Sequence, residues 1–169
     1  ELKKEEWSKI ETILMNAIKD IKEFRAHEGL SLETDLKSHV TNISNLLDEA
    51  LKYEQERITT VKDRLKNNLE ELEQKITINE ERFEQELIYY IEKYDISEEK
   101  VRLKAHCDYF METMNGDAGQ GKKLGFISQE MGREINTLGS KANHAEMQKI
   151  VVQMKDELEK IKEQVLNVL

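Results

Sequence analysis

LETDLKSHVTNISNLLDEALKYEQERITTVKDRLKNNLEELEQKITI, residues 32–78, is the longest helical pattern in the chain. Its apolar residues recur at steps of mostly three and four, the spacing of one face of an α-helix. They are Leu36, Val40, Ile43, Leu47, Leu51, Ile58, Val61, Leu65, Leu69, Leu72 and Ile76. Because no residue in the stretch stops a helix, it predicts a single helix of about 65–70 Å. A break near residues 53–60, where the stripe is weakest, is the alternative.

Similar spacing extends on both sides of this stretch. Residues 2–24 carry it, and Gly29 predicts a helix end because glycine terminates helices well. No segment shows the strict alternation of a half-buried strand. Four further helices are expected, over residues 79–94, from 97 to about 114, from about 122 with a weakening at 139, and over about 143–168.

These patterns predict an all-α fold of long antiparallel helices packed as an extended coiled-coil-like bundle. We expect a long helical hairpin or coiled-coil region over residues 1–78 and a C-terminal helical domain over residues 79–169. The chain has no proline, and six of its seven glycines lie between Gly116 and Gly139. Helix breakers are therefore rare outside that segment.

The net charge of −9 argues against nonspecific binding to nucleic acid. Residues 97–149, however, hold eight acids and eight bases, so the excess negative charge lies elsewhere. The single cysteine, Cys107, excludes an internal disulfide and suits a reducing cytoplasm. No signal peptide is visible, and no apolar run approaches the roughly 20 residues of a membrane span. Because the chain opens at Glu1 within a helical pattern, we expect a part of a larger protein.

The segment from Lys122 to Ala142 has two distinct helical faces. Drawn at 100° per residue, one face is apolar and consists of Leu124, Ile127, Met131, Ile135, Leu138 and Ala142. The opposite face consists of Glu130, Arg133, Glu134, Thr137 and Lys141. This face has two interpretations. It is a solvated surface of salt bridges, or it is a site in which carboxylates hold a divalent cation and the basic groups receive a phosphate.

Two other groups of residues also have structural explanations. Acids gather at Glu80, Glu81, Glu84, Glu86, Asp95, Glu98 and Glu99. Asp95 followed by Glu98 matches a capping box, with Ser97 as an alternative cap, so helix capping accounts for the last three. Cys107 fits a small core residue, although its pairing with a distant histidine in catalysis remains open.

The string KKLGFISQEMGREINTLGSK, residues 122–141, closely resembles the C-terminal signature of the YicC-like endoribonuclease family. Other segments resemble further blocks of that family in the same order. They are RAHEG (25–29) with Asp35 and Leu36, RFEQEL (82–87) with Asp95 and Ile96, RLKAH (102–106), and KEQVLN (162–167). The resemblance covers nearly the whole chain.

This resemblance implies a bacterial cytoplasmic enzyme that cleaves single-stranded RNA with help from Mg²⁺ or Mn²⁺. It also implies an N-terminal domain that is missing from this chain. The implied assembly is a ring-like homo-oligomer, with a hexamer as one candidate, and the implied partners include other RNA-degradation proteins. The implied catalytic residues are Glu130, Glu134, Arg133 and His106. The implied metal ligands are Glu84, Glu86, Asp95, Glu99, Glu130 and Glu134. The implied RNA-binding residues are Lys122, Lys123, Arg133, Asn136, Ser140 and Lys141.

Two other functions remain open beside metal-dependent cleavage of RNA. The long apolar stripe of residues 36–76 and the acidic surface suit a non-catalytic helical module that drives oligomerisation. The basic residues suit an adaptor that binds RNA and presents it to another nuclease. Loss of cleavage with EDTA, or after Glu134→Ala, distinguishes the enzyme from both alternatives.

Overall fold

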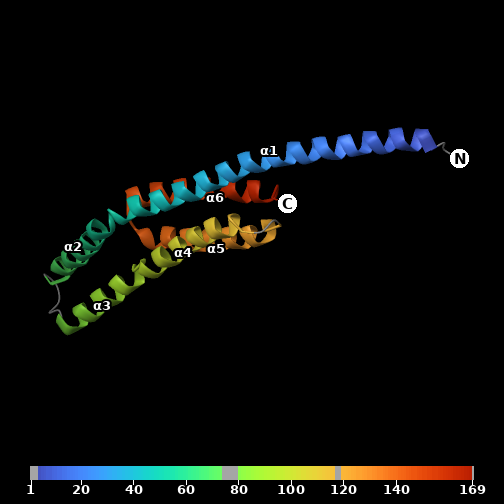
Figure 1. Ribbon diagram of the computed structural model, residues 1–169. Helices are drawn as coiled ribbons and strands as arrows, with labels where there is room; N and C mark the ends of the chain where they lie inside the picture. The colour runs from blue at the N-terminus through green and yellow to red at the C-terminus, as the bar shows by residue number, and fades with distance from the viewer. Residues whose placement is uncertain (1–3, 74–79, 117–118, 169) are drawn as a thin grey trace. The chain divides into compact units, whose positions relative to one another are not determined.

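The computed structural model describes residues 4–73, 80–116 and 119–168 of the chain. Helices make up most of these three segments, and no strand occurs within them. The helices are α1 (Lys4–Leu51), α2 (Glu54–Glu73), α3 (Glu80–Lys93), α4 (Ser97–Met114), α5 (Gly121–Ala142) and α6 (Ala145–Val165) (Figure 1). The prediction of an all-α fold of long packed helices is confirmed. In the described part of the chain, no helix offers an apolar stretch suited to crossing a bilayer.

The chain divides into two compact units, residues 1–37 and residues 38–169, and the boundary falls inside α1. In the first unit the apolar stripe of α1 is exposed, at Trp7, Ile10, Leu14, Ile18, Ile21 and Phe24. The candidate functional residues from Glu84 onwards all lie in the second unit. The domain boundary expected after residue 78 falls within residues 74–79, outside the described residues, and stays a prediction.

Helix α1 runs through Gly29, so the predicted helix end at this position is wrong. A single glycine costs only about 1 kcal/mol relative to alanine inside a helix. The residues on both sides continue the helix, and without a proline every backbone donor stays available. A Cβ built at Gly29 would meet nothing within 4 Å, so no close approach demands glycine here.

The pattern of residues 32–78 does not form one continuous helix. Helix α1 ends at Leu51, and the backbone N–H groups of Lys52 and Tyr53 donate to carbonyls three residues earlier, at 3.2 and 3.1 Å. Helix α2 then begins at Glu54. The alternative prediction, a break near residues 53–60, is therefore confirmed, at the point where the apolar stripe weakens.

The second unit is organised around α5, which packs against α4 and α6. All six residues of the predicted apolar face of α5 are buried. The core also includes Leu103 and Phe110 of α4 and Met154 of α6. The part of α1 beyond residue 37 contributes buried residues at Val40, Ile43, Leu47 and Ala50. Burying these faces against one another accounts for the fold of this unit.

Two glycines of α5 allow α6 to approach closely. A Cβ built at Gly139 would lie 2.9 Å from Cγ1 of Val151, and one at Gly132 would lie 3.1 Å from Cδ2 of Leu158. The concentration of glycine in this segment therefore serves helix packing as well as loops. The two helices are joined through Asn143, whose left-handed φ of 41° ends α5. For this reason α6 begins at Ala145, two residues later than expected.

Candidate functional site

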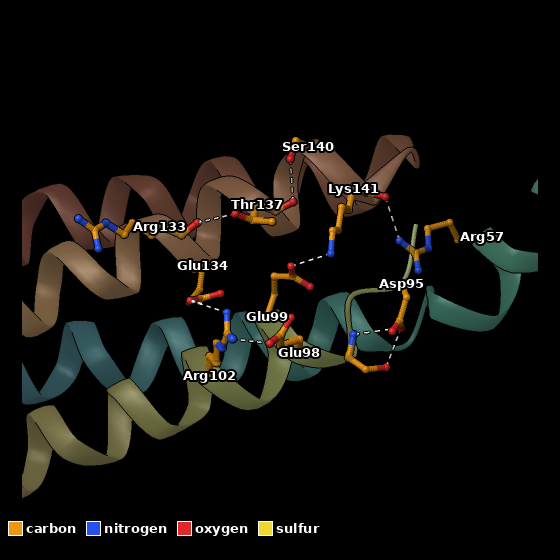
Figure 2. A network of polar contacts seen from close by, with 11 residues as sticks. Arg57, Asp95, Glu98, Glu99, Arg102, Arg133, Glu134, Thr137, Ser140 and Lys141 are labelled. Carbon is orange, nitrogen blue, oxygen red and sulfur yellow. Dashed lines mark hydrogen bonds and ion pairs between the residues drawn. The ribbon is translucent and has the colours of Figure 1, made fainter. Parts of the chain in front are cut away.

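Polar side chains from α4 and α5 face one another along the second unit (Figure 2). Lys141 pairs with Glu99, and Glu134 lies opposite Arg102. Residue numbers rise along α4 as they fall along α5, so the two helices are antiparallel. We call this surface the polar strip and define it by Glu99, Arg102 and His106 of α4 with Glu130, Arg133, Glu134, Thr137 and Lys141 of α5.

Glu99 is the most buried acid of the strip, with 5% of its surface exposed. One carboxylate oxygen accepts a hydrogen bond from Nζ of Lys141 at 2.7 Å. The other oxygen, Oε2, is buried and finds no hydrogen-bond partner among the described residues. A buried polar atom without a partner is costly. Glu99 therefore holds an acceptor that a bound cation or a donor group would satisfy.

Glu134 is the second enclosed acid, with 12% of its side chain exposed. Its Oε1 atom lies 4.0 Å from Nη1 of Arg102, while the same guanidinium donates to Glu98. Arg102 is itself half exposed, so it can exchange these carboxylates for another anion. A pair of enclosed carboxylates, each beside an accessible cation, is thus built where α4 and α5 meet.

Arg57 of α2 joins the network at the end of α5 and was missed by the sequence analysis (Figure 2). Only 3% of its surface is exposed, and Nη1 donates to the backbone carbonyl of Lys141 at 3.0 Å. Desolvation lowers the pKa of its guanidinium, although the charges of Glu54 and Asp95 act in the opposite direction. Its Nε atom is buried and has no partner within the described segments.

A signal for Arg57 exists in the sequence. Ala50, Glu54, Arg57 and Val61 are separated by four, three and four residues, so Arg57 occupies an inward position of the helical stripe. A charge at such a position is rarely buried unless it is paired. The guanidinium stabilises the carbonyl end of α5, where a helix favours positive charge, and fixes the backbone that carries Lys141.

Asp95, in the connection between α3 and α4, has a structural role in this conformation. It accepts hydrogen bonds from Oγ of Ser97 at 2.7 Å and from its backbone N–H at 3.1 Å. The hydrogen bond from the Ser97 hydroxyl lowers the pKa of Asp95 the most, and the bond from the backbone N–H lowers it further. The charge of Lys141 acts in the same direction. The predicted capping box with Glu98 is not formed, because α4 begins at Ser97 and Glu98 pairs instead with Arg102.

The other predicted residues of α5 are mostly exposed. Glu130 pairs with Arg133 at 2.7 Å within the helix, and the guanidinium remains open to solvent. Asn136 is exposed, and the hydroxyl of Ser140 donates to the carbonyl of Thr137. The two predicted RNA-binding lysines lie in the first turn of α5. Lys122 is exposed, and Nζ of Lys123 lies 4.6 Å from the ring centroid of Tyr109.

The remaining candidates lie on α4 and α3. His106 is partly buried, and its spacing from Arg102 places it on the strip side of α4. Glu84 and Glu86 are exposed on α3, which packs against α2. In the chain by itself, the structure pairs Glu99 with Lys141 and places Glu134 opposite Arg102. Within the described residues, neither pair contacts Glu84 or Glu86.

The acids do not form a complete metal site within one chain. Over residues 4–73, 80–116 and 119–168, no group of three or more His, Cys, Asp or Glu side chains is placed to hold an ion. Glu99 and Glu134 face cationic side chains, and Asp95 accepts from Ser97. The unpaired oxygen of Glu99 fits a hard cation, which prefers oxygen ligands. Further ligands would have to come from outside these residues.

Cys107 is part of the core rather than the strip. It is almost fully buried, and burial raises the pKa of its thiol to about 11. Since the thiolate is the nucleophilic form, this cysteine is poorly suited to catalysis near neutral pH. The structure therefore favours the packing interpretation over the cysteine–histidine alternative.

Residues 50–169, which include the whole strip, match a family model for a C-terminal endoribonuclease domain, described as "Endoribonuclease YicC-like, C-terminal". This places the second unit, nearly entirely, in a class of helical domains associated with RNA cleavage. The match covers more than half of the chain, and the chain therefore belongs to the YicC-like endoribonuclease family. The family expected from the sequence is confirmed.

Two curated relatives carry the name "Probable endoribonuclease YicC". The protein from Clostridioides difficile (strain 630) is 34% identical over 163 residues, which is 96% of this chain and 56% of the relative. The protein from Haemophilus influenzae (strain ATCC 51907 / DSM 11121 / KW20 / Rd) is 35% identical over 66 residues, 39% of this chain and 23% of the relative. The chain thus spans about half the length of the Clostridioides protein.

Proposed function

We propose that this chain forms part of an endoribonuclease and that its polar strip binds the scissile phosphodiester of single-stranded RNA. The observation that carries the proposal is the ion pair between buried Glu99 and partly exposed Lys141, in which the carboxylate keeps one oxygen unpaired within the described residues. Both residues lie in the region that matches the family model. A buried acceptor without a partner is rare in folded proteins, and sites that bind a ligand are one place where such groups occur.

In this proposal, basic groups of the strip hold the phosphate. Lys141 and Arg102 would exchange their carboxylate partners for phosphate oxygens, and Arg133 reaches from the open side of the strip. Guanidinium groups bind phosphate through two parallel hydrogen bonds, and lysine acts as a point charge. Binding should therefore weaken as salt rises, by about 0.7 log units per phosphate contact for each tenfold increase in salt.

The enclosed carboxylates and His106 would supply proton transfer. When Lys141 turns to the phosphate, Glu99 is left as a desolvated carboxylate that can accept a proton. Glu134 stands in a similar position beside Arg102. General acid–base groups contribute roughly 10²- to 10⁴-fold to the rate of a reaction. We assign the base to Glu99 or Glu134, and we assign the group that donates to the leaving oxygen to His106.

We further propose that Mg²⁺ or Mn²⁺ assists the reaction. Whichever of Glu99 and Glu134 does not act as the base would contribute a ligand, and other ligands would come from a neighbouring subunit or from another part of the protein. Such an ion neutralises the charge that develops on a phosphodiester during cleavage. If EDTA leaves cleavage of RNA unchanged, this part of the proposal is wrong, while the role of the strip is untouched.

The test measures cleavage of a fluorescent single-stranded RNA by the intact protein. Glu134→Gln keeps the shape of the side chain and removes its charge, so the cleavage rate should fall by about 10²-fold or more. Glu146→Gln is the matched control, because Glu146 forms an exposed pair with Lys149 on α6, a helix that contributes no residue to the strip. Glu99→Gln should have a comparable effect, and cleavage at the wild-type rate by both the Glu134 and the Glu99 variants would contradict the proposal.

A second candidate function is a non-catalytic oligomerisation module or RNA-binding adaptor. It is favoured by the exposed apolar stripe on α1 in the first unit, which includes Trp7, Ile21 and Phe24. Self-association through this stripe is compatible with either function, and so is a cytoplasmic location. The oligomerisation module requires that the intact protein self-associates without cleaving RNA, and the adaptor requires that it binds RNA without turnover. The cleavage assay distinguishes both from the enzyme.

A further inference from the structure

Two aromatic side chains are exposed beside the polar strip. Tyr109 of α4 is 44% exposed, and Phe126 of α5 is 59% exposed. Neither belongs to the residues that the family resemblance implies for the site. Large aromatic groups left in water commonly mark a binding surface when they gather with other groups of defined chemistry.

Helix geometry places these aromatic residues at one end of the strip. Phe126 precedes Glu130 by four residues, and Lys123 precedes Phe126 by three, so both share the outward face of α5. On the opposite helix, Tyr109 follows His106 by three residues. The antiparallel register that pairs Glu99 with Lys141 therefore brings Tyr109 beside Lys123.

A cation completes the group. Nζ of Lys123 lies 4.6 Å from the centroid of the Tyr109 ring, within the range of a cation–π interaction. Lys122, next along the chain, is also exposed. Lysine is depleted at the centre of protein–protein interfaces. Proteins that bind single-stranded nucleic acid, in contrast, combine aromatic faces for the bases with cations for the backbone.

We propose that Tyr109 and Phe126 stack unpaired RNA bases while Lys123 contacts an adjacent phosphate. This inference rests on the proposed function. It adds that this end of the strip recognises unpaired bases of the RNA substrate. A base in a duplex is covered on both faces by its neighbours, whereas an unpaired base can offer a face to an aromatic ring. The aromatic group would therefore select single-stranded RNA.

The spacing suits a short strand of RNA. Phe126 and Lys141 are 15 residues apart on one helix, so their Cα atoms are separated by about 22 Å along α5. A strand that runs along the strip would place one base on the aromatic group while a more distant phosphate lies beside Lys141. The aromatic group thus fixes the register of the strand, and the far end of the strip acts on the backbone.

The test uses the intact protein and a single-stranded oligoribonucleotide that contains one 2-aminopurine, moved stepwise along its sequence. At the positions that lie on the two rings the fluorescence should fall on binding, because stacking quenches 2-aminopurine. Phe126→Leu and Tyr109→Leu should each abolish the quenching of the base on the replaced ring and weaken binding about tenfold, which corresponds to about 1.4 kcal/mol. Lys123→Gln should instead reduce the slope of log affinity against log salt concentration by about 0.7, which is the contribution of one phosphate contact.

The matched control is Tyr89→Leu. Tyr89 is 57% exposed on α3 and also has a lysine near its ring, with Nζ of Lys93 at 5.9 Å from the centroid. This variant should bind RNA and quench 2-aminopurine as the wild type does. A second control replaces the stacked base by an abasic site, which should bind equally to the wild type and to Phe126→Leu.

Wild-type quenching and affinity in both aromatic variants would overturn this inference. A change in oligomeric state with unchanged RNA binding would also overturn it, because the aromatic group would then be a protein interface. Either result leaves the proposed function standing if the wild type cleaves RNA. If the wild type binds RNA with quenching but never cleaves it, the proposed function fails and the stacking inference survives.

Discussion

At the residue scale, the polar strip depends on carboxylates whose partners are cations that solvent can reach. Glu99 is enclosed and has one oxygen without a partner among the described residues. Glu157, elsewhere in the same unit, has hydrogen-bond partners for both of its carboxylate oxygens. His39 and Asn42 of α1 contact Oε2 of Glu157 at 2.8 and 2.9 Å, and Lys160 donates to Oε1. This contrast separates a carboxylate that stabilises the fold from one that has capacity to bind.

Glu157 supplies a prediction about stability and pH. Burial raises its pKa and is the largest single influence, but hydrogen bonds from Lys160, Asn42 and His39 together outweigh it and lower the pKa from 4.5 to about 2. Because the folded pKa is depressed, the stabilisation is present above about pH 4.5 and is lost as the pH falls towards 2. Glu157→Gln should destabilise the protein by about 1–3 kcal/mol at pH 7.

Urea denaturation at a series of pH values checks this expectation. The wild type should lose more stability than the Gln variant between pH 4.5 and 2. Glu159→Gln, which removes an exposed carboxylate paired with Lys162 on the same helix, is the control. Equal pH dependence in the wild type and the Glu157 variant would show that the carboxylate makes no net contribution.

At the element scale, periodicity was enough to predict the apolar face of α5, and all six of its members are buried. The use of glycine as a helix-end signal gave the wrong result at Gly29, because a local helix breaker competes with long helical segments on both sides. The pairing of Glu99 with Lys141 could not be predicted from the residues, because it depends on the register between α4 and α5. Arg57 was missed because its partner carbonyl is 84 residues away.

The glycines of α5 give a prediction at the same scale. In Gly139→Ala, the new Cβ would lie 2.9 Å from Cγ1 of Val151, a β-branched residue with little rotamer freedom in a helix. The clash should exceed the gain of about 1 kcal/mol in helix propensity, giving a net loss of about 1 kcal/mol. Chemical denaturation measures this change in the free energy of unfolding.

Gly125→Ala is the matched variant in the same helix. Its Cβ would lie 3.7 Å from Val165, an ordinary van der Waals distance, so this variant should gain up to about 1 kcal/mol. The two substitutions are therefore expected to have opposite signs. Stabilisation by Gly139→Ala would mean that α6 can move away from α5 at little cost.

At the scale of the whole molecule, the second unit brings together residues from α2, α4 and α5 that are far apart in the sequence (Figure 2). The family resemblance indicated most of these residues, but it could not show which of them meet in one chain. Glu84 and Glu86 are close to Asp95 in the sequence, yet they lie on α3, which packs against α2. A metal site that includes Glu84 or Glu86 would need ligands from another subunit or from residues outside the described part of the chain.

The central claim is that single-stranded RNA lies along the polar strip, and photocrosslinking tests it most directly. The intact protein is bound to RNA that contains 4-thiouridine, irradiated, digested and analysed by mass spectrometry. Crosslinks should fall on α4 between residues 99 and 109 and on α5 between residues 123 and 141. Crosslinks confined to other helices, with none on α4 or α5, would contradict the claim.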